Sequence, residues 1–591
     1  MKLGSNKRLA NIKTRRETGL DYITQNLELG TPFGRKELQA ISPYFPGEED
    51  ELRNELDHIE EMMEFVKGAP DLYNAIQMVF MEIKDPTFTV ERSEKNILSV
   101  VELYEVKSLL LQMRQLLKIT KEKTIGDYKG CHSVEECMKD SSGVRPQNDM
   151  SDANSNVIPS EAKNTLDNLA VPSEYILEDT EELLDVLDPR KDRINTFYIY
   201  DEFSEKLGQL REKKRLIEIN IRKEQKETRE NLRREHGVNL TPKFDIVVSK
   251  SHPDFEKISN LSELEVVDQD YMSVTFQLKP TEKVHGFNKD MEELNVLIDE
   301  EEERIREVLS KRVSEYKDII LSNCEKIGKL DLVLAKSIFF IKHNMVKPEI
   351  VDEHVIEITE GRNVQVEDIL KSKGKEYCPV SISLKDGVTL ITGANMGGKT
   401  ISLKLSGQVP ILAQYGFFSP AKHAKVGLSN YIQILIGDSQ SVERGLSSFG
   451  SEMEELKEIL DHGVDRSLIL VDEIASGTNP TEGTALTRSL VDYLMTKPYI
   501  SLITTHFESV TETPGTVNMQ VKGLADADFT LLNREIQYAK RRDRINIISK
   551  YMDYRLVRVE ENKQVPKDAL NIASMLGIDK GIIEGAKKYI K

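Results

Sequence analysis

The spacing of apolar residues separates a helical first part of the chain from a mixed last part. Up to about residue 127, apolar residues recur every three or four positions, as in DELRNELDHIEEMMEFVKG and ILSVVELYEVKSLLLQMRQLLKI. That period places apolar side chains on one face of an α-helix. We therefore expect a helical core over residues 1–127, followed by a loose linker over the polar, turn-rich residues 128–175.

The next region predicts a long arm with a small β-rich tip. Residues 202–236 carry many charges and few apolar positions, which is typical of an exposed helix in a coiled-coil arm. KFDIVVSK and YMSVTFQL alternate and are rich in β-branched residues, so they predict strands. The helical pattern resumes near Asn288. We expect lever helices over residues 176–346, with the tip at about residues 237–287.

The pattern changes again from about residue 347. Short apolar runs alternate with helical stretches, and the runs are GVTLITG, SLILVDE, YISLITTH and TVNMQVKG. This alternation predicts an α/β domain with a mainly parallel sheet over residues 347–565. Two short helices are expected over residues 566–591. A chain of 591 residues is also long enough for several domains.

Charge and cysteine usage narrow the class of protein. The formal net charge of −19 argues against a chain that coats nucleic acid generally, although a local basic patch could bind it. Four cysteines without CxxC spacing favour reduced thiols in a cytoplasmic protein. No apolar run reaches 18 residues, so no membrane-spanning segment or membrane partner is expected.

The run GANMGGKT fits the phosphate-binding pattern G-x-x-x-x-G-K-[ST], between a predicted strand and a helical stretch. Glycines let backbone N–H groups approach phosphates, and a helix N-terminus adds positive potential. Lys399 should reach the β- and γ-phosphates and Thr400 should bind Mg²⁺, so ATP and Mg²⁺ are the expected ligands. The expected ATP-binding residues here are Gly393, Ala394, Asn395, Met396, Gly397, Gly398, Lys399, Thr400 and Ile401.

Two later strand ends carry candidate catalytic groups. SLILV leads directly into Asp472 and Glu473. Buried carboxylates are costly unless they have partners, so this pair favours a metal ligand at Asp472 and a water-orienting base at Glu473 over a merely solvated acidic pair. His506 follows YISLITT and is expected to contact the γ-phosphate or water. A histidine by itself is usually incidental, but this one follows the third matching strand, which favours the functional interpretation.

Taken together, TGANMGGKT, DEIASGT and TTH resemble the MutS family. The resemblance implies an ABC-like P-loop ATPase with catalytic Lys399, Glu473 and His506, behind an all-α core and lever with a clamp tip. YCPVSISL resembles the adenine-side loop, which implies that Tyr377 stacks on the base. A trans-acting loop is implied at Ser447, Ser448 and Phe449, with Ser447 reaching the partner subunit's γ-phosphate.

The resemblance further implies a homodimer, with residues 566–591 as the dimerisation element. The chain resembles a short form without the family's N-terminal mismatch-reading domain and C-terminal nuclease domain. Two functions stay open. One is an ATP-switched clamp on mismatched or branched DNA in repair or recombination. The other is an ATP-driven remodeller of a protein client, such as a reactivating factor for a cobalamin-dependent amino-acid aminomutase. A scaffold without turnover is disfavoured by Glu473.

Overall fold

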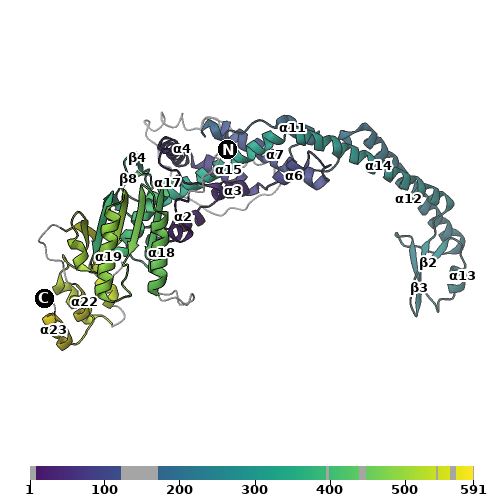
Figure 1. Ribbon diagram of the computed structural model, residues 1–591. Coiled ribbons are helices and arrows are strands. Elements are labelled where there is room, and N and C mark those ends of the chain that lie inside the picture. The colour runs from purple at the N-terminus through teal and green to yellow at the C-terminus, as the bar shows by residue number, and fades with distance from the viewer. Residues whose placement is uncertain are drawn as a thin grey trace, which may run out of the picture. The chain divides into compact units, whose positions relative to one another are not determined.

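The computed structural model describes residues 8–121, 171–393, 398–437, 448–540, 544–559 and 568–589. The chain forms two compact units (Figure 1). The first is Met1–Asn74, Leu169–Tyr175 and Ile327–Lys591, and the second is Ala75–Asn168 and Ile176–Lys326. Most of the predicted linker over residues 128–175 lies outside the described residues. No helix in the described part of the chain has the length and apolarity needed to cross a membrane.

Among the described residues, helices build the base of the second unit. They are the later part of α5 (Pro70–Glu82), α6 (Thr87–Arg92), α7 (Val100–Lys121) and α11 (Glu181–Leu187). A fully buried ion pair joins α7 to the segment after α11, because Lys107 Nζ lies 3.1 Å from Asp188 Oδ1. The backbone N–H of Arg193 also donates to Asp188. Paired charges of this kind can be buried at an acceptable cost.

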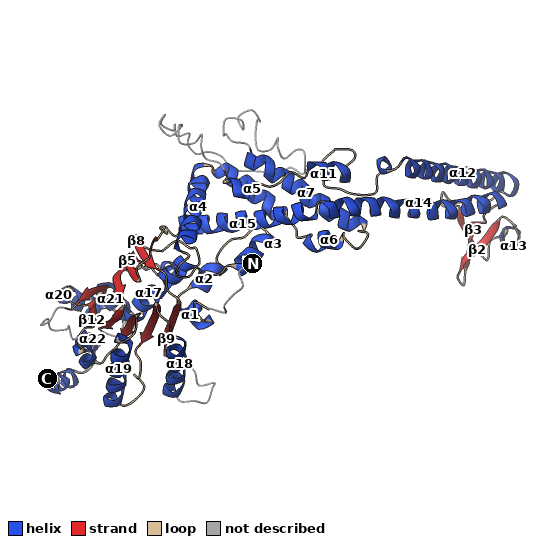
Figure 2. Ribbon diagram, turned by 45° about the horizontal axis from the view of Figure 1, so that its top comes forward, coloured by secondary structure: helices blue, strands red, loops and turns tan. Residues whose placement is uncertain are grey.

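A two-helix arm extends from this base. Helix α12 (Glu205–His236) and helix α14 (Glu282–Glu315) lie side by side, and the small sheet lies at their far end (Figures 1 and 2). The Ser204 hydroxyl caps the start of α12, and Gly237 ends it in a left-handed conformation. The helix predicted over residues 202–236 is therefore confirmed. The later helical run is divided at Tyr316 into α14 and α15 (Lys317–Lys342).

The tip is a three-stranded antiparallel sheet in the order β1-β3-β2. Its elements are β1 (Asp245–Ser249), α13 (Phe255–Ser259), β2 (Leu264–Gln269) and β3 (Ser273–Leu278). The strands predicted from KFDIVVSK and YMSVTFQL correspond to β1 and β3. The sequence did not predict β2, because only Leu264 of its six residues is buried and no alternation marks it.

The largest sheet belongs to the first unit and has the order β13-β12-β7-β11-β10-β9. Its strands are β7 (Gly387–Thr392), β9 (Tyr431–Ile436), β10 (Ser467–Asp472), β11 (Tyr499–Thr504), β12 (Val517–Gly523) and β13 (Asp553–Arg558). All neighbours pair in parallel except β12 and β13. The predicted mainly parallel sheet is confirmed.

Both faces of this sheet are covered by helices, which explains its continuous apolar strands. Ile469 and Val471 of β10 face the core shared with α18 (Ser448–His462) and α19 (Pro480–Met495). Leu470 points to the opposite face, where it contacts Gly407 of α17 (Gly398–Gln414). Figure 2 shows α17 on one side of the strands and α18 and α19 on the other.

A smaller mixed sheet and further helices complete the first unit. The sheet has the order β4-β8-β5-β6, with β4 (Glu349–Val351), β5 (Val355–Gly361), β6 (Val380–Lys385) and β8 (His423–Gly427). The helices are α1 (Ile12–Glu17), α2 (Leu20–Gln25), α3 (Pro32–Ala40), α4 (Glu49–Gly68), α16 (Val364–Ser372), α20 (Phe529–Tyr538), α21 (Arg544–Tyr551), α22 (Asp568–Met575) and α23 (Lys580–Tyr589).

Candidate functional site

The predicted chemistry converges at one edge of the large sheet. Strands β7, β10 and β11 are parallel, so their carboxyl ends lie at the same edge. Gly393 follows β7, Asp472 ends β10 and Thr504 ends β11. Helix α17 begins at Gly398, so Lys399 and Thr400 lie in its first turn.

Two glycines lie in tight local geometry. Gly393 has φ +127°, in the region that favours glycine. A β-carbon at Gly398 would lie 3.1 Å from Cδ1 of Tyr554, so the backbone comes close to that ring. Ala394, Asn395, Met396 and Gly397, which are also predicted ATP-binding residues, lie outside the described residues.

Lys399 is the centre of a compact charged cluster. Its side chain is 3% exposed, and Nζ donates to the carbonyl oxygen of Gly393 at 2.9 Å. Nζ also lies 3.1 Å from Glu473 Oε1 and within 3.2 Å of both ring nitrogens of His506. Burial lowers the pKa of Lys399, and the nearby carboxylate of Glu473 opposes that shift.

Glu473 and His506 are in direct contact. The distance from His506 Nε2 to Glu473 Oε1 is 2.7 Å. The hydrogen bond from His506 is the largest cause that lowers the pKa of Glu473, to about 2, and the Lys399 ammonium lowers it further. Both contacts use Oε1. Sequence reasoning named all three residues, and the structure brings them together.

Asp472 is held by two hydroxyl groups. Thr400 Oγ1 donates to Asp472 Oδ2 at 2.8 Å, and Thr504 Oγ1 donates to Oδ1 at 2.5 Å. Thr504 Oγ1 also accepts a hydrogen bond from the backbone N–H of Glu473 at 3.0 Å. Thr504 therefore positions both acids, although sequence reasoning did not select it. The sequence feature that could have indicated this role is the position of Thr504, a hydroxyl residue at the end of the strand that precedes His506.

A second overlooked residue lies on α18. Glu473 and Ala475 have φ values of +47° and +58°, which L-residues adopt rarely. The backbone N–H of Ala475 donates to Glu452 Oε2 at 3.1 Å. Burial raises the pKa of Glu452. The carboxylate of Glu452 thus supports the turn that presents Glu473.

The structure describes some, but not all, of the residues implied for the trans-acting loop and for the contact with the base. Ser447 lies outside the described residues, and Ser448 is the first residue of α18. Phe449 packs against the core under α18 and α19. Tyr377 is partly buried, and burial raises the pKa of its hydroxyl to about 12. The ring seen against the phosphate-binding segment is that of Tyr554, beside Gly398.

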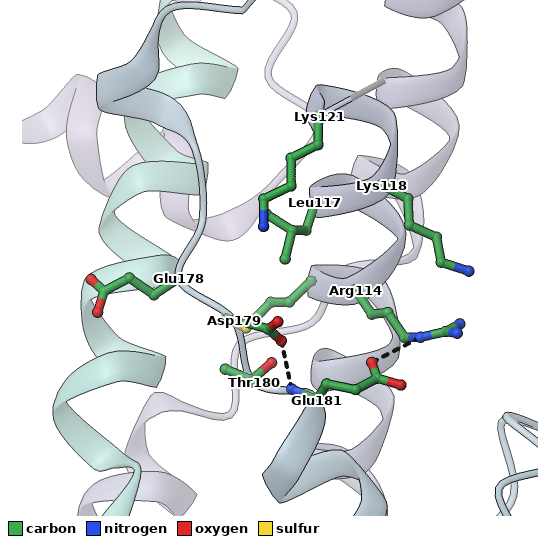
Figure 3. Close-up of a pocket in the computed structure, with 9 residues that line it drawn as sticks. Arg114, Leu117, Lys118, Lys121, Glu178, Asp179, Thr180 and Glu181 are labelled. Atoms are coloured by element: carbon green, nitrogen blue, oxygen red, sulfur yellow. Dashed lines mark hydrogen bonds and ion pairs between the residues drawn. The ribbon is translucent and has the colours of Figure 1, made fainter. Parts of the chain in front are cut away.

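A separate hollow of about 400 Å³ lies in the second unit, between the end of α7 and the segment that leads into α11 (Figure 3). Its charged lining residues are Arg114, Lys118, Lys121, Glu178, Asp179 and Glu181. Arg114 is already paired with Glu181 at 2.9 Å, and Lys118 points away from Lys121. Because its charges balance, this hollow does not favour an ionic ligand.

The residues at the sheet edge fit a nucleotide and a hard cation. Gly393 and Gly398 carry no side chain that would stand between the backbone N–H groups and a phosphate. Lys399 supplies a buried positive charge. A carboxylate at Asp472 and a hydroxyl at Thr400 are oxygen ligands of the kind Mg²⁺ prefers.

Comparison with known proteins agrees with this placement. The family model for MutS domain V matches residues 389–590. The protein named Endonuclease MutS2 from Clostridium botulinum (strain ATCC 19397) is 34% identical over 248 residues, which are 42% of this chain and 31% of that protein. The Clostridium tetani protein of the same name is 31% identical over 329 residues, which are 55% of this chain and 38% of that protein.

A third protein of that name, from Shouchella clausii, is 30% identical over 328 residues, or 55% of this chain and 38% of that protein. The chain thus spans about a third of the length of these curated relatives. Its parallel-rich sheet with covering helices places it among α/β proteins. Residues 389–590 are thus similar to MutS domain V, which is the ATPase domain of the MutS family.

Proposed function

We propose that this chain is a P-loop ATPase with an ABC-like nucleotide domain, and that ATP binding and hydrolysis switch a DNA clamp. The observation that most directly supports this proposal is that Lys399, Glu473 and His506 lie together beside the Asp472–Thr400 pair. If Asp472 and Glu473 were only a solvated acidic pair at a strand end, the contacts of the buried Lys399 with both Glu473 and His506 would have no explanation. The family match of residues 389–590 supports the same reading.

The chain's own residues suit hydrolysis of the γ-phosphate. Lys399 would exchange its contact with Glu473 for the β- and γ-phosphates. Losing that ammonium would raise the pKa of Glu473 and make it a better base. Oε2 of Glu473, which takes part in neither contact described above, would orient the attacking water. The water oxygen bonds to the γ-phosphorus as the bond to ADP breaks, and its proton passes to Glu473 or bulk water.

Thr400 and Asp472 would hold Mg²⁺, which neutralises phosphate charge when bound. Thr504 keeps the Asp472 carboxylate directed toward Thr400. His506 holds Glu473 through the 2.7 Å contact and would itself contact the γ-phosphate or water. Tyr377 is proposed to stack on the adenine.

The active form is proposed to be a homodimer. Residues 566–591, which include α22 and α23, would be the dimerisation element, and Ser447 would contact the partner subunit's γ-phosphate. Mixing Ser447→Ala and Lys399→Ala subunits should restore part of the ATPase activity, because a heterodimer keeps one intact composite site. No recovery, together with a monomeric mass in the presence of ATP, would contradict this assembly.

Residues 176–346 are proposed to form the lever, with the clamp at about residues 237–287. Mismatched or branched DNA is the proposed partner, because residues 389–590 match the MutS domain V model. The charge of the tip favours a second candidate, a protein client that ATP would remodel. Residues 237–281 hold seven carboxylates against four lysines, which repels a phosphate backbone.

The ATPase rate, titrated with junction DNA at low and physiological salt, tests the partner. A DNA clamp predicts stimulation of severalfold at low salt that weakens as salt rises. Deletion of the tip should abolish this stimulation. A flat response at both salt concentrations would contradict the DNA clamp. ATP-driven release of a co-purified protein would then support the remodeller.

A further inference from the structure

A cationic groove lies between α20 and α21 in the first unit, where the two helices lie side by side (Figure 2). Leu531, Arg534 and Tyr538 share one face of α20, since they are spaced by three and four residues. Ile547 and Lys550 of α21 face them across a hollow of about 600 Å³. This groove belongs to the same unit as the nucleotide site but shares none of its residues.

The cations of the groove are available to a ligand. Arg534, Lys540 and Lys550 are exposed and form no ion pair with any residue that the structure describes. The one carboxylate in the lining, Glu535, accepts a hydrogen bond from the Tyr551 hydroxyl at 3.0 Å.

The surrounding sequence is basic in an acidic chain. Residues 529–558 contain eight lysines and arginines against three acids, whereas the whole chain has a net charge of −19. Such a local reversal of sign directs a polyanion to this surface rather than to the rest of the molecule.

Tyr538 makes the groove suitable for a base as well as for phosphates. Its side chain is 85% exposed beside the three cations. An exposed ring next to positive charge is the arrangement by which proteins bind single-stranded nucleic acid, with bases stacked on rings and phosphates on cations. An acidic peptide would use the charges but would not require the exposed ring.

We propose that this groove binds single-stranded nucleic acid, with a base stacked on Tyr538 and phosphates at Arg534, Lys540 and Lys550. The inference rests on the nucleic-acid partner of the proposed function and adds a contact within the ATPase-bearing unit. Phe88 of α6 offers a contrast outside the clamp tip, because its ring is also exposed, at 75%, but does not line this groove.

Fluorescence anisotropy of a labelled oligo-dT with the nucleotide-free full chain tests the stacking. Tyr538→Ala should weaken binding about tenfold, as expected for loss of one stacked base. Phe88→Ala is the control and should bind as the wild-type chain does. Both residues are exposed, so neither change should affect folding, which thermal unfolding checks. Equal affinity of Tyr538→Ala and wild type would overturn the proposal.

Salt dependence tests the phosphate contacts independently. Replacing Arg534, Lys540 and Lys550 with glutamine should reduce the slope of log affinity against log salt by about 2, at about 0.7 per lost contact. An unchanged slope would overturn the proposal. Competition with a polyglutamate peptide gives a second contradicting outcome. If this peptide displaces labelled oligo-dT at a lower concentration than unlabelled oligo-dT does, the groove fits an acidic protein partner and the proposal is overturned.

These results are separable from the fate of the proposed ATPase. The groove variants should hydrolyse ATP at the wild-type rate without DNA, because none of their residues belongs to the nucleotide site. Loss of turnover in Glu473→Gln would support the proposed ATPase. Unaltered DNA binding in Tyr538→Ala would at the same time contradict DNA binding by the groove. Wild-type protein that binds no DNA would remove both the groove and the DNA partner.

Discussion

The carboxylate of Glu452 accepts a hydrogen bond from the backbone N–H of Ala475, with 3.1 Å between Oε2 and N. This bond joins α18 to the turn that follows β10 and presents Glu473. Ala475 is fully buried, so its N–H has no access to water if the carboxylate is removed. An unsatisfied buried donor is costly, and the left-handed turn at Glu473 and Ala475 needs such support.

Glu452→Leu should lower kcat for ATP by about 10- to 100-fold, because a small displacement of a catalytic group is enough for that loss. KM should change little, because the proposed phosphate and Mg²⁺ contacts of Lys399 and Thr400 come from α17 and not from this turn. Glu452→Gln keeps an acceptor oxygen and should retain most activity. Equal loss in both variants, or a change confined to KM, would contradict a positioning role.

Thr504→Val should reduce turnover and raise the Mg²⁺ concentration needed for half-maximal activity. The substitution keeps the shape of the side chain but removes the hydroxyl that contacts both Asp472 and the Glu473 N–H. Thr504→Ser is the matched control, because it keeps the hydroxyl. A magnesium titration of both variants checks this expectation, and an unaltered magnesium requirement in Thr504→Val would count against it.

Lys399→Ala should abolish ATPase activity while the chain stays folded. The substitution removes the buried ammonium that would contact the β- and γ-phosphates. Glu473 keeps its direct partner His506, so the rest of the cluster retains a contact. Circular dichroism and a steady-state ATPase assay provide the two measurements. Turnover equal to that of the wild-type chain would show that Lys399 does not bind the phosphates.

The pH dependence of stability should report the Glu473 cluster. The pKa of Glu473 is lowered from 4.5 to about 2, first by the hydrogen bond from His506 and then by Lys399. Its ionised form therefore stabilises the folded state above pH 4.5, and this contribution is lost as pH falls toward 2. The difference in Tm between wild type and Glu473→Gln should shrink across that interval. A constant difference from pH 6 to pH 3 would contradict the ion pairing.

The sequence predicted the site best where one short segment carries the whole signal. Lys399, Asp472 and His506 each follow an apolar run, and strands that are parallel bring such ends together. Glu452 and Thr504 escaped prediction because their roles depend on contacts across 23 and 31 residues of chain. Strand β2 escaped because its exposed residues show no alternation. Contacts between residues far apart in the chain determine these two roles and this strand, and the local sequence pattern carries no information about such contacts.

Single-turnover hydrolysis of radiolabelled ATP by Glu473→Gln tests the central claim most directly. Glutamine keeps the shape of the side chain but cannot accept a proton as a carboxylate does. If Glu473 is the base, the variant binds ATP as the wild-type chain does, while its rate of hydrolysis falls by at least about 100-fold. Hydrolysis at the wild-type rate would contradict the assignment of Glu473 and leave His506 as the next candidate base.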